Sequence, residues 1–276
     1  MRAAFTTPEL PYFYVELGAA TGYGAHDGGI DGSFVTQRQA QRAALLLKSV
    51  DFATAIDLGG KQGNVHSPRK QEVGRRLSLK VLTKVYGMGG AIKPSAMGPV
   101  LKSIGPVTSS GSSIDVTLVF DPATATTLHS HGTADCAILN GSSMKCCDQS
   151  PFQIGLVDGS WVRATVLQIN EASIKLTAPI ASADHATDVR YAWDSYPQCA
   201  IYNGVGGPEN HTGVAAAPFR WALPRASGGN PCPAGSTACT GSPEGATQCC
   251  TSATTALYPE GEVCKNTAGC LNGAQK

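Results

Sequence analysis

Residues 51–77, DFATAIDLGGKQGNVHSPRKQEVGRRL, carry the clearest signal of a fold in this chain. The stretch begins with a mostly apolar run that is typical of a buried strand, and two glycines end that run. His66 follows on a Gly-rich loop. Ligands of open α/β sheets collect beyond the carboxyl ends of the strands, so a side chain on such a loop faces a ligand rather than the core. We therefore expect His66 to be a functional residue.

The second half of this stretch predicts a helix. Ser67 is a typical N-cap, and Pro68 suits the first helical position because its missing N–H is not needed there. Apolar residues then recur at every fourth position, which predicts one helix face packed against a sheet: Val73, Leu77, Val81 and Val85.

The residues upstream extend the same α/β pattern. Residues 11–19, PYFYVELGA, predict a buried strand, and residues 35–48 predict a helix because they are rich in Ala, Leu, Gln and Arg. With residues 51–58 as a second strand, the order is strand, helix, strand, helix. This order indicates the closing half of a parallel α/β sheet over residues 1–90.

From about Pro99 the hydrophobic period changes to two, which is typical of a β-sandwich. The strand candidates are SIDVTLVF (113–120), PFQIGL (151–156), WVRATVLQI (161–169), ASIKLTAPI (172–180) and DVRYAW (188–193). We therefore expect an all-β, sandwich-like domain over residues 91–222. Residues 223–276 form an irregular Cys/Gly/Pro-rich tail, which needs disulfides because it lacks apolar periodicity.

Composition excludes several classes of function. Charged residues make up 15% of the 276 residues and the net charge is +1, which argues against nucleic acid as a partner. The chain has no apolar run of about 18 residues, so we expect no transmembrane helix. It has no Cys-x-x-Cys pair, and His129 and His131 alone do not indicate zinc, so we expect no metal and no other cofactor. Nothing indicates an oligomeric state.

The ten cysteines all lie between Cys136 and Cys270, in the pattern of a disulfide framework from an oxidising compartment. The sequons that begin at Asn140 and Asn210 agree with a secreted glycoprotein. Residues 1–17, however, contain no signal peptide. Either the signal lies upstream of a truncated gene model, which we favour, or the cysteines are reduced in a cytosolic protein.

Several blocks, in this order, resemble the C-terminal portion of the sialate O-acetylesterase family of SGNH-type serine esterases. They are PELPYFYVEL (8–17), RQAQRAALLL (38–47), ATAIDLGG (53–60), VHSPRKQEVGRRLSL (65–79), GPVLKS (98–103), VRYAWDSYPQCAIYN (189–203) and APFR (217–220). The resemblance implies a partial SGNH-hydrolase domain with a flavodoxin-like parallel sheet. One departure is Glu16, where the family usually has Gln.

The resemblance also implies a mechanism and a substrate. His66 matches the family's catalytic base, which takes the proton of a serine that attacks an acetyl ester on a sugar, sialic acid or similar. Asp57 is the nearest carboxylate in sequence that could orient the imidazole. Two alternatives stay open: Asp57 is a strand-end turn former, or a backbone carbonyl fixes the tautomer and leaves a dyad.

Two residues are candidates for substrate binding. Arg38 and Gln41 lie one helical turn apart in the RQAQ block, where they could face the active-site loops. The alternative is a solvated helix face.

Residues 1–65 contain no counterpart of the family's serine nucleophile. The family carries it in a Gly-x-Ser-like block, whereas residues 1–65 contain Ser33 and Ser49, both of which we expect to be structural. We therefore expect an incomplete esterase that does not turn over by itself. The alternative function is a non-catalytic extracellular module that binds glycan or protein.

Overall fold

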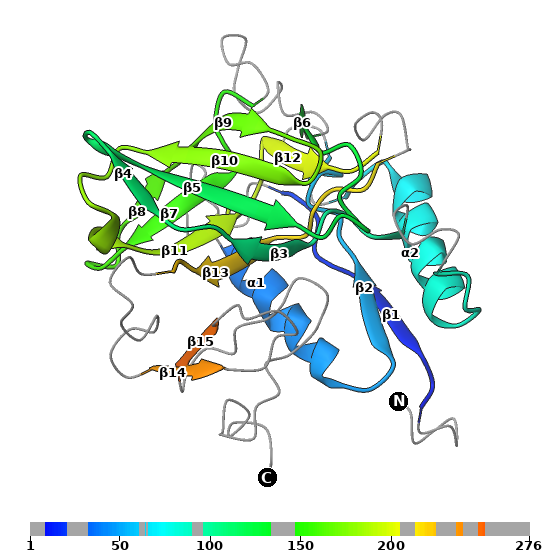
Figure 1. Ribbon diagram of the computed structural model, residues 1–276. Coiled ribbons are helices and arrows are strands. Elements are labelled where there is room, and N and C mark those ends of the chain that lie inside the picture. The colour runs from blue at the N-terminus through cyan, green and yellow to red at the C-terminus, as the bar shows by residue number, and fades with distance from the viewer. Residues whose placement is uncertain are drawn as a thin grey trace. The chain divides into compact units, whose positions relative to one another are not determined.

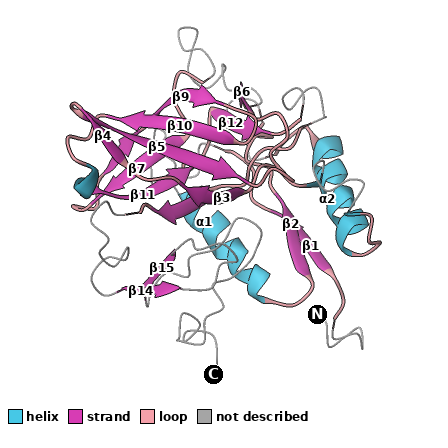
Figure 2. Cartoon of the chain, viewed as in Figure 1, coloured by secondary structure: helices cyan, strands magenta, loops and turns pink. Residues whose placement is uncertain are grey.

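The computed structural model describes most of the chain (Figures 1 and 2), and the chain falls into two compact units. The described residues are 9–20, 33–60, 64, 66–89, 96–133, 147–204, 213–224, 236–239 and 248–251. Unit 1 comprises Met1–Pro99, Ala123–Gln149 and Asp194–Ala217, and unit 2 comprises Val100–Pro122, Ser150–Trp193 and Pro218–Lys276. The units alternate along the chain, whereas the three predicted domains (1–90, 91–222 and 223–276) follow one another; those boundaries stay a prediction.

Unit 1 contains the expected α/β segment. Strands β1 (Tyr12–Val15) and β2 (Val50–Ala53) pair in parallel, with Tyr12 opposite Val50. Between them lie helix α1 (Ser33–Arg42) and the short 3-10 helix η2 (Ala43–Leu46), and helix α2 (Lys70–Lys84) follows β2 and packs against both strands. The order strand, helix, strand, helix is confirmed. Within the described residues the parallel sheet has these two strands, so a full flavodoxin-like sheet is not shown.

Helix α2 differs from its prediction at its start and on its buried face. It begins at Lys70, after a turn in which Ser67 Oγ accepts a hydrogen bond from the Arg69 N–H (3.1 Å). The predicted apolar face is confirmed in part: Val73, Leu77 and Val81 are half-buried, whereas Val85 lies beyond the helix and is 47% exposed. The fully buried side chains of the helix are Glu72 and Arg76. This face can be charged because β2 and the residues after it supply polar partners.

A second sheet and a disulfide complete the described part of unit 1. Strand β6 (His129–Gly132) pairs antiparallel with β12 (Cys199–Tyr202), and Cys147 is bonded to Cys199. This disulfide supports the expected framework for one pair. The sequon residues Asn140 and Asn210 lie outside the described residues.

Two antiparallel sheets make up most of the described part of unit 2. The first has the order β3 (Leu101–Ile104), β5 (Ser113–Phe120), β10 (Ser173–Ala178), β9 (Thr165–Ile169), with β4 (Thr108–Ser110) beside β5. The second has the order β13 (Phe219–Ala222), β11 (Ala186–Tyr191), β7 (Phe152–Leu156), β8 (Trp161–Arg163). The 3-10 helix η4 (Ala183–His185) precedes β11.

The core of unit 2 lies between these sheets. Alternate residues of β5 are buried, as the period of two predicts. Phe120 of the first sheet meets Phe219 of the second edge to face, with ring centroids 6.3 Å apart, and Phe219 stacks on Tyr191. The expected predominance of β-strands is confirmed. The tail is not wholly irregular, because β14 (Ser236–Cys239) and β15 (Gln248–Thr251) pair antiparallel.

Candidate active site

His66 lies exposed on the loop that follows β2. The Gly60 N–H donates to the Asn64 carbonyl (3.0 Å), and the His66 N–H donates to Asn64 Oδ1 (2.9 Å). Residues 61–63 and 65 lie outside the described residues. The two hydrogen bonds tie the backbone at His66 to the end of the β2 segment, while the side chain remains accessible to solvent.

Two glycines let this loop approach its neighbours closely. A Cβ atom at Gly60 would lie 2.7 Å from the Asn64 carbonyl oxygen, and one at Gly59 would lie 2.5 Å from the Tyr196 ring and 2.8 Å from the Ala19 carbonyl oxygen. Real Cβ atoms do not tolerate such distances, so glycine is required here. The end of the β1 segment, the His66 loop and the segment around Tyr196 therefore meet.

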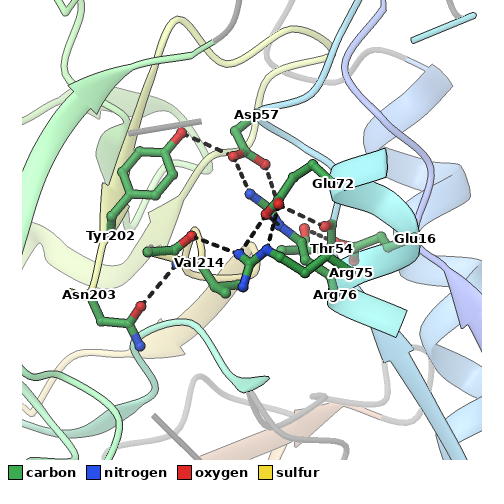
Figure 3. Close-up of polar contacts among 10 residues, drawn as sticks. Glu16, Thr54, Asp57, Glu72, Arg75, Arg76, Tyr202, Asn203 and Val214 are labelled. Atoms are coloured by element: carbon green, nitrogen blue, oxygen red, sulfur yellow. Dashed lines mark hydrogen bonds and ion pairs between the residues drawn. The ribbon is translucent and has the colours of Figure 1, made fainter. Parts of the chain in front are cut away.

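Asp57, in the segment before this loop, is fully buried in a hydrogen-bond network (Figure 3). Arg76 forms a two-pronged ion pair with it, Nη1 to Oδ1 at 2.6 Å and Nη2 to Oδ2 at 2.7 Å, and the Tyr202 hydroxyl donates to Oδ2 at 3.1 Å. In the described part of the chain, Asp57 has no hydrogen bond with His66. The structure thus brings Asp57 to Arg76 and Tyr202, and its predicted role in orienting the imidazole stays a prediction.

Arg76 links helix α2 to the segment that follows β2. Its Nε donates to Glu72 Oε1 (2.7 Å) and its Nη1 also donates to the Thr54 carbonyl (3.0 Å). Burial disfavours the charged form of Arg76, but the carboxylates of Asp57 and Glu72 outweigh it and raise the pKa of the guanidinium above its usual value. Arg76 is therefore a permanent cation inside unit 1.

Glu72 is held in its charged form as well. Burial by itself would raise the pKa of its carboxyl group, but the hydrogen bonds from Arg75 and the charge of Arg76 lower the pKa below the usual value. Arg75 donates to both carboxylate oxygens, at 2.6 and 2.8 Å. Two guanidiniums thus face the two carboxylates of Asp57 and Glu72, which offsets the cost of burying them.

A second buried pair explains the departure at Glu16. Glu16 is fully buried; its Oε1 accepts from Arg42 Nε (2.7 Å) and its Oε2 accepts from Thr54 Oγ1 (2.8 Å). A carboxylate in place of the usual amide adds a negative charge, and Arg42 neutralises it.

The Arg38 side chain of α1 is buried and binds backbone carbonyls, whereas one alternative from the sequence was a solvent-exposed helix face. The side chain is 2% exposed, so that alternative is wrong for this residue. Its guanidinium makes four hydrogen bonds of 2.8–2.9 Å to backbone carbonyls, those of Leu17, Gly18, Asp194 and Ser195. Burial, with the nearby charge of Arg42, lowers the pKa of Arg38 to about 10 against the opposing carboxylates, so the group stays charged at neutral pH.

Gln41 binds the backbone at the end of the same strand, β1. Its Oε1 accepts from the Leu17 N–H (2.8 Å) and its Nε2 donates to the Val15 carbonyl (3.4 Å). Arg38 and Gln41 therefore position the backbone at the end of β1, and substrate binding by these two side chains stays a prediction.

Sequence reasoning missed Arg76, Glu72 and Tyr202 as parts of this site. The i, i+4 spacing of Glu72 and Arg76 is a local signal for an ion pair and could have been found. Tyr202 lies 145 residues from Asp57, so no local pattern joins them.

The described residues contain neither a candidate metal site nor a membrane-spanning helix. No three or more His, Cys, Asp or Glu side chains there gather in a way that could hold a metal ion. No helix among those residues is long and apolar enough to cross a membrane.

Comparison with known proteins places this site in a family context. Residues 115–210 match the sialate O-acetylesterase C-terminal domain. Among solved structures, the chain resembles one described as a novel carbohydrate acetylesterase from Xanthomonas citri, with a TM-score of 0.52 and 22% identity, covering 79% of this chain. The chain spans 43% of the length of that structure, and a likeness at this identity shows the fold. The comparison with curated proteins found no match.

The matched region includes part of the buried network but not the candidate base. Tyr202, which donates to Asp57, lies inside residues 115–210, whereas His66 lies outside them. The resemblance drawn from the sequence is thereby confirmed, since residues 115–210 match the C-terminal domain of the sialate O-acetylesterase family.

Proposed function

We propose that this protein is a carbohydrate O-acetylesterase that hydrolyses acetyl esters on sugars such as sialic acid, with His66 as general base. The observation that carries the proposal is the exposed His66 on a tethered loop after a parallel strand. Such a loop borders the crevice in which α/β sheets bind their ligands. The family match at residues 115–210 supports acetylated sugars as the substrate class.

The proposed reaction is acyl transfer through a serine. His66 accepts the proton of a serine hydroxyl as its oxygen bonds to the acetyl carbon, and then gives that proton to the departing sugar oxygen. Water, deprotonated by the same imidazole, attacks the acetyl-enzyme and releases acetate, and the imidazolium returns the proton to the serine oxygen as its bond to the acetyl carbon breaks. Residues 1–65 contain no recognisable nucleophile block, so we expect the 276 residues alone to release no acetate.

The test is acetate release from O-acetylated sialic acid and from p-nitrophenyl acetate. Both the 276-residue chain and the longest form that its gene encodes are assayed. His66→Ala should abolish the release, whereas His185→Ala, at an exposed histidine of unit 2, should not change it. Unchanged activity in His66→Ala would refute the proposal. Glycan binding without acetate release in any form would favour the non-catalytic module.

We also infer that the protein folds in the secretory pathway. The Cys147–Cys199 disulfide supports this compartment, because such bonds persist in oxidising environments. Peptide mapping of protein from its native source, alkylated before lysis, should recover these two cysteines linked. Recovery of both as free thiols would contradict the inference.

A further inference from the structure

We propose that Arg76 is a positioning residue for His66: acting through Asp57, it fastens the two ends of the segment that carries the base. The proposal rests on the proposed function of His66. Its physical basis is the network in Figure 3, in which a guanidinium on α2 binds the carboxylate that follows β2.

The positions of the two residues in the chain give the ion pair this role. Asp57 lies before the loop and Arg76 lies in α2 after it, so their contact closes a segment with His66 near its middle. Holding the ends of a segment together restricts the conformations of everything between them. The hydrogen bonds from Gly60 and His66 to Asn64 then form in a segment whose two ends the ion pair holds together.

The geometry of the pair favours orientation over simple charge neutralisation. Two parallel N–H···O bonds, at 2.6 and 2.7 Å, fix the carboxylate plane as well as its position. Lysine would keep the positive charge but make a single point contact. Replacing Arg76 by Lys therefore keeps the neutralisation of charge and removes the two-pronged orientation of the Asp57 carboxylate.

Tyr202 forms a second contact that fixes the position of the Asp57 carboxylate. Its hydroxyl donates to Oδ2, and its ring is fully buried and stacks on His129, with ring centroids 5.7 Å apart. Because Tyr202 belongs to β12 rather than to α2, Asp57 is fixed from two different elements. Tyr202→Phe removes the hydrogen bond to Asp57 and keeps the ring.

The experiment compares Arg76→Lys with the matched control Arg42→Lys. Arg42 is also a buried arginine of unit 1 paired with a buried carboxylate, but its partner Glu16 adjoins β1 and reaches the segment after β2 through the Thr54 hydroxyl, not through Asp57. Activity is measured as kcat and KM for acetate release by the longest encoded form. Hydrogen exchange at the Gly60 and His66 amides is measured on the 276-residue chain, so that this readout does not need turnover.

We expect Arg76→Lys to lower kcat by roughly 10–100-fold with little change in KM, because displacing a catalytic group by about 1 Å costs up to 10²-fold. The Gly60 and His66 amides should exchange at least about tenfold faster than in the parent chain, with a smaller change in Tyr202→Phe. Arg42→Lys should lower the melting temperature but leave kcat and these two amides nearly unchanged.

The outcomes separate this proposal from the function on which it rests. If His66→Ala leaves acetate release unchanged, the proposed function fails. If His66→Ala abolishes release but Arg76→Lys matches Arg42→Lys in kcat and in amide exchange, the positioning role alone is overturned. In a chain without turnover, equal amide exchange in the two arginine variants overturns it as well.

Discussion

Asp57 and Arg76 lie 19 residues apart in sequence and form a completely buried, two-pronged ion pair, with N···O distances of 2.6 and 2.7 Å. The pair joins the segment after β2 to helix α2, beside the half-buried apolar residues that the helix pattern predicts. The stability of this unit therefore depends on keeping both partners, since a buried charge without its partner is costly.

Replacing Arg76 by Met should lower the free energy of unfolding by about 3–5 kcal/mol, because it leaves two buried carboxylates facing one remaining arginine. Urea denaturation measures this loss. The control is Arg220→Met, whose pair with Asp188 involves a side chain that is 48% exposed, and which should cost about 0–1 kcal/mol. Equal losses in the two variants would contradict the argument from burial.

Replacing Glu16 by Gln restores the residue that the family usually has, and yet it should destabilise this protein. The neutral amide would leave the buried Arg42 without its carboxylate, at a cost of about 1–3 kcal/mol. The double variant Glu16→Gln/Arg42→Gln should recover part of that loss. A double-mutant cycle by thermal unfolding measures the coupling, and a coupling near zero would show that the pair is not compensatory.

Gly60→Ala and Gly74→Ala should act in opposite directions. A Cβ at Gly60 meets the Asn64 carbonyl oxygen at 2.7 Å, so alanine should displace the His66 loop, reduce stability and reduce any acetate release. A Cβ at Gly74, inside α2, meets nothing within 4 Å, so alanine there should stabilise the helix by about 0.5–1 kcal/mol. Melting temperatures of the two variants test this, and a stabilising Gly60→Ala would refute the loop geometry.

Glu72 should make stability depend on acid pH. Its carboxyl pKa is lower in the folded protein than the usual 4.5, so the unfolded chain binds more protons between the two pKa values. The contribution of Glu72 is complete above the unfolded pKa and is lost as the pH falls through the folded pKa. The difference in unfolding free energy between the parent and Glu72→Gln should therefore shrink on acidification below about pH 4.5. A difference that stays constant down to pH 2 would contradict the shift.

The sequence by itself determined the local elements. The alternation of apolar residues predicted the strand at residues 113–120, which is β5 with the same bounds, and the block around residue 66 predicted strand, loop and helix in that order. The family was readable too, because its motifs are short and continuous along the chain. Local periodicity and propensity depend on neighbouring residues, so these features need no tertiary structure.

Only the tertiary structure decided which face of α2 is buried and what Asp57 binds. The stripe of Val73, Leu77 and Val81 is half-buried, whereas Glu72 and Arg76 beside it are fully buried. Arg76 can be buried because two carboxylates that lie apart in sequence, Asp57 and Glu72, converge on it. The same holds for Arg38, whose four carbonyl partners come from β1's end and from residues 194–195. The energy of a buried charge depends on partners that are distant along the chain, and no local pattern contains them.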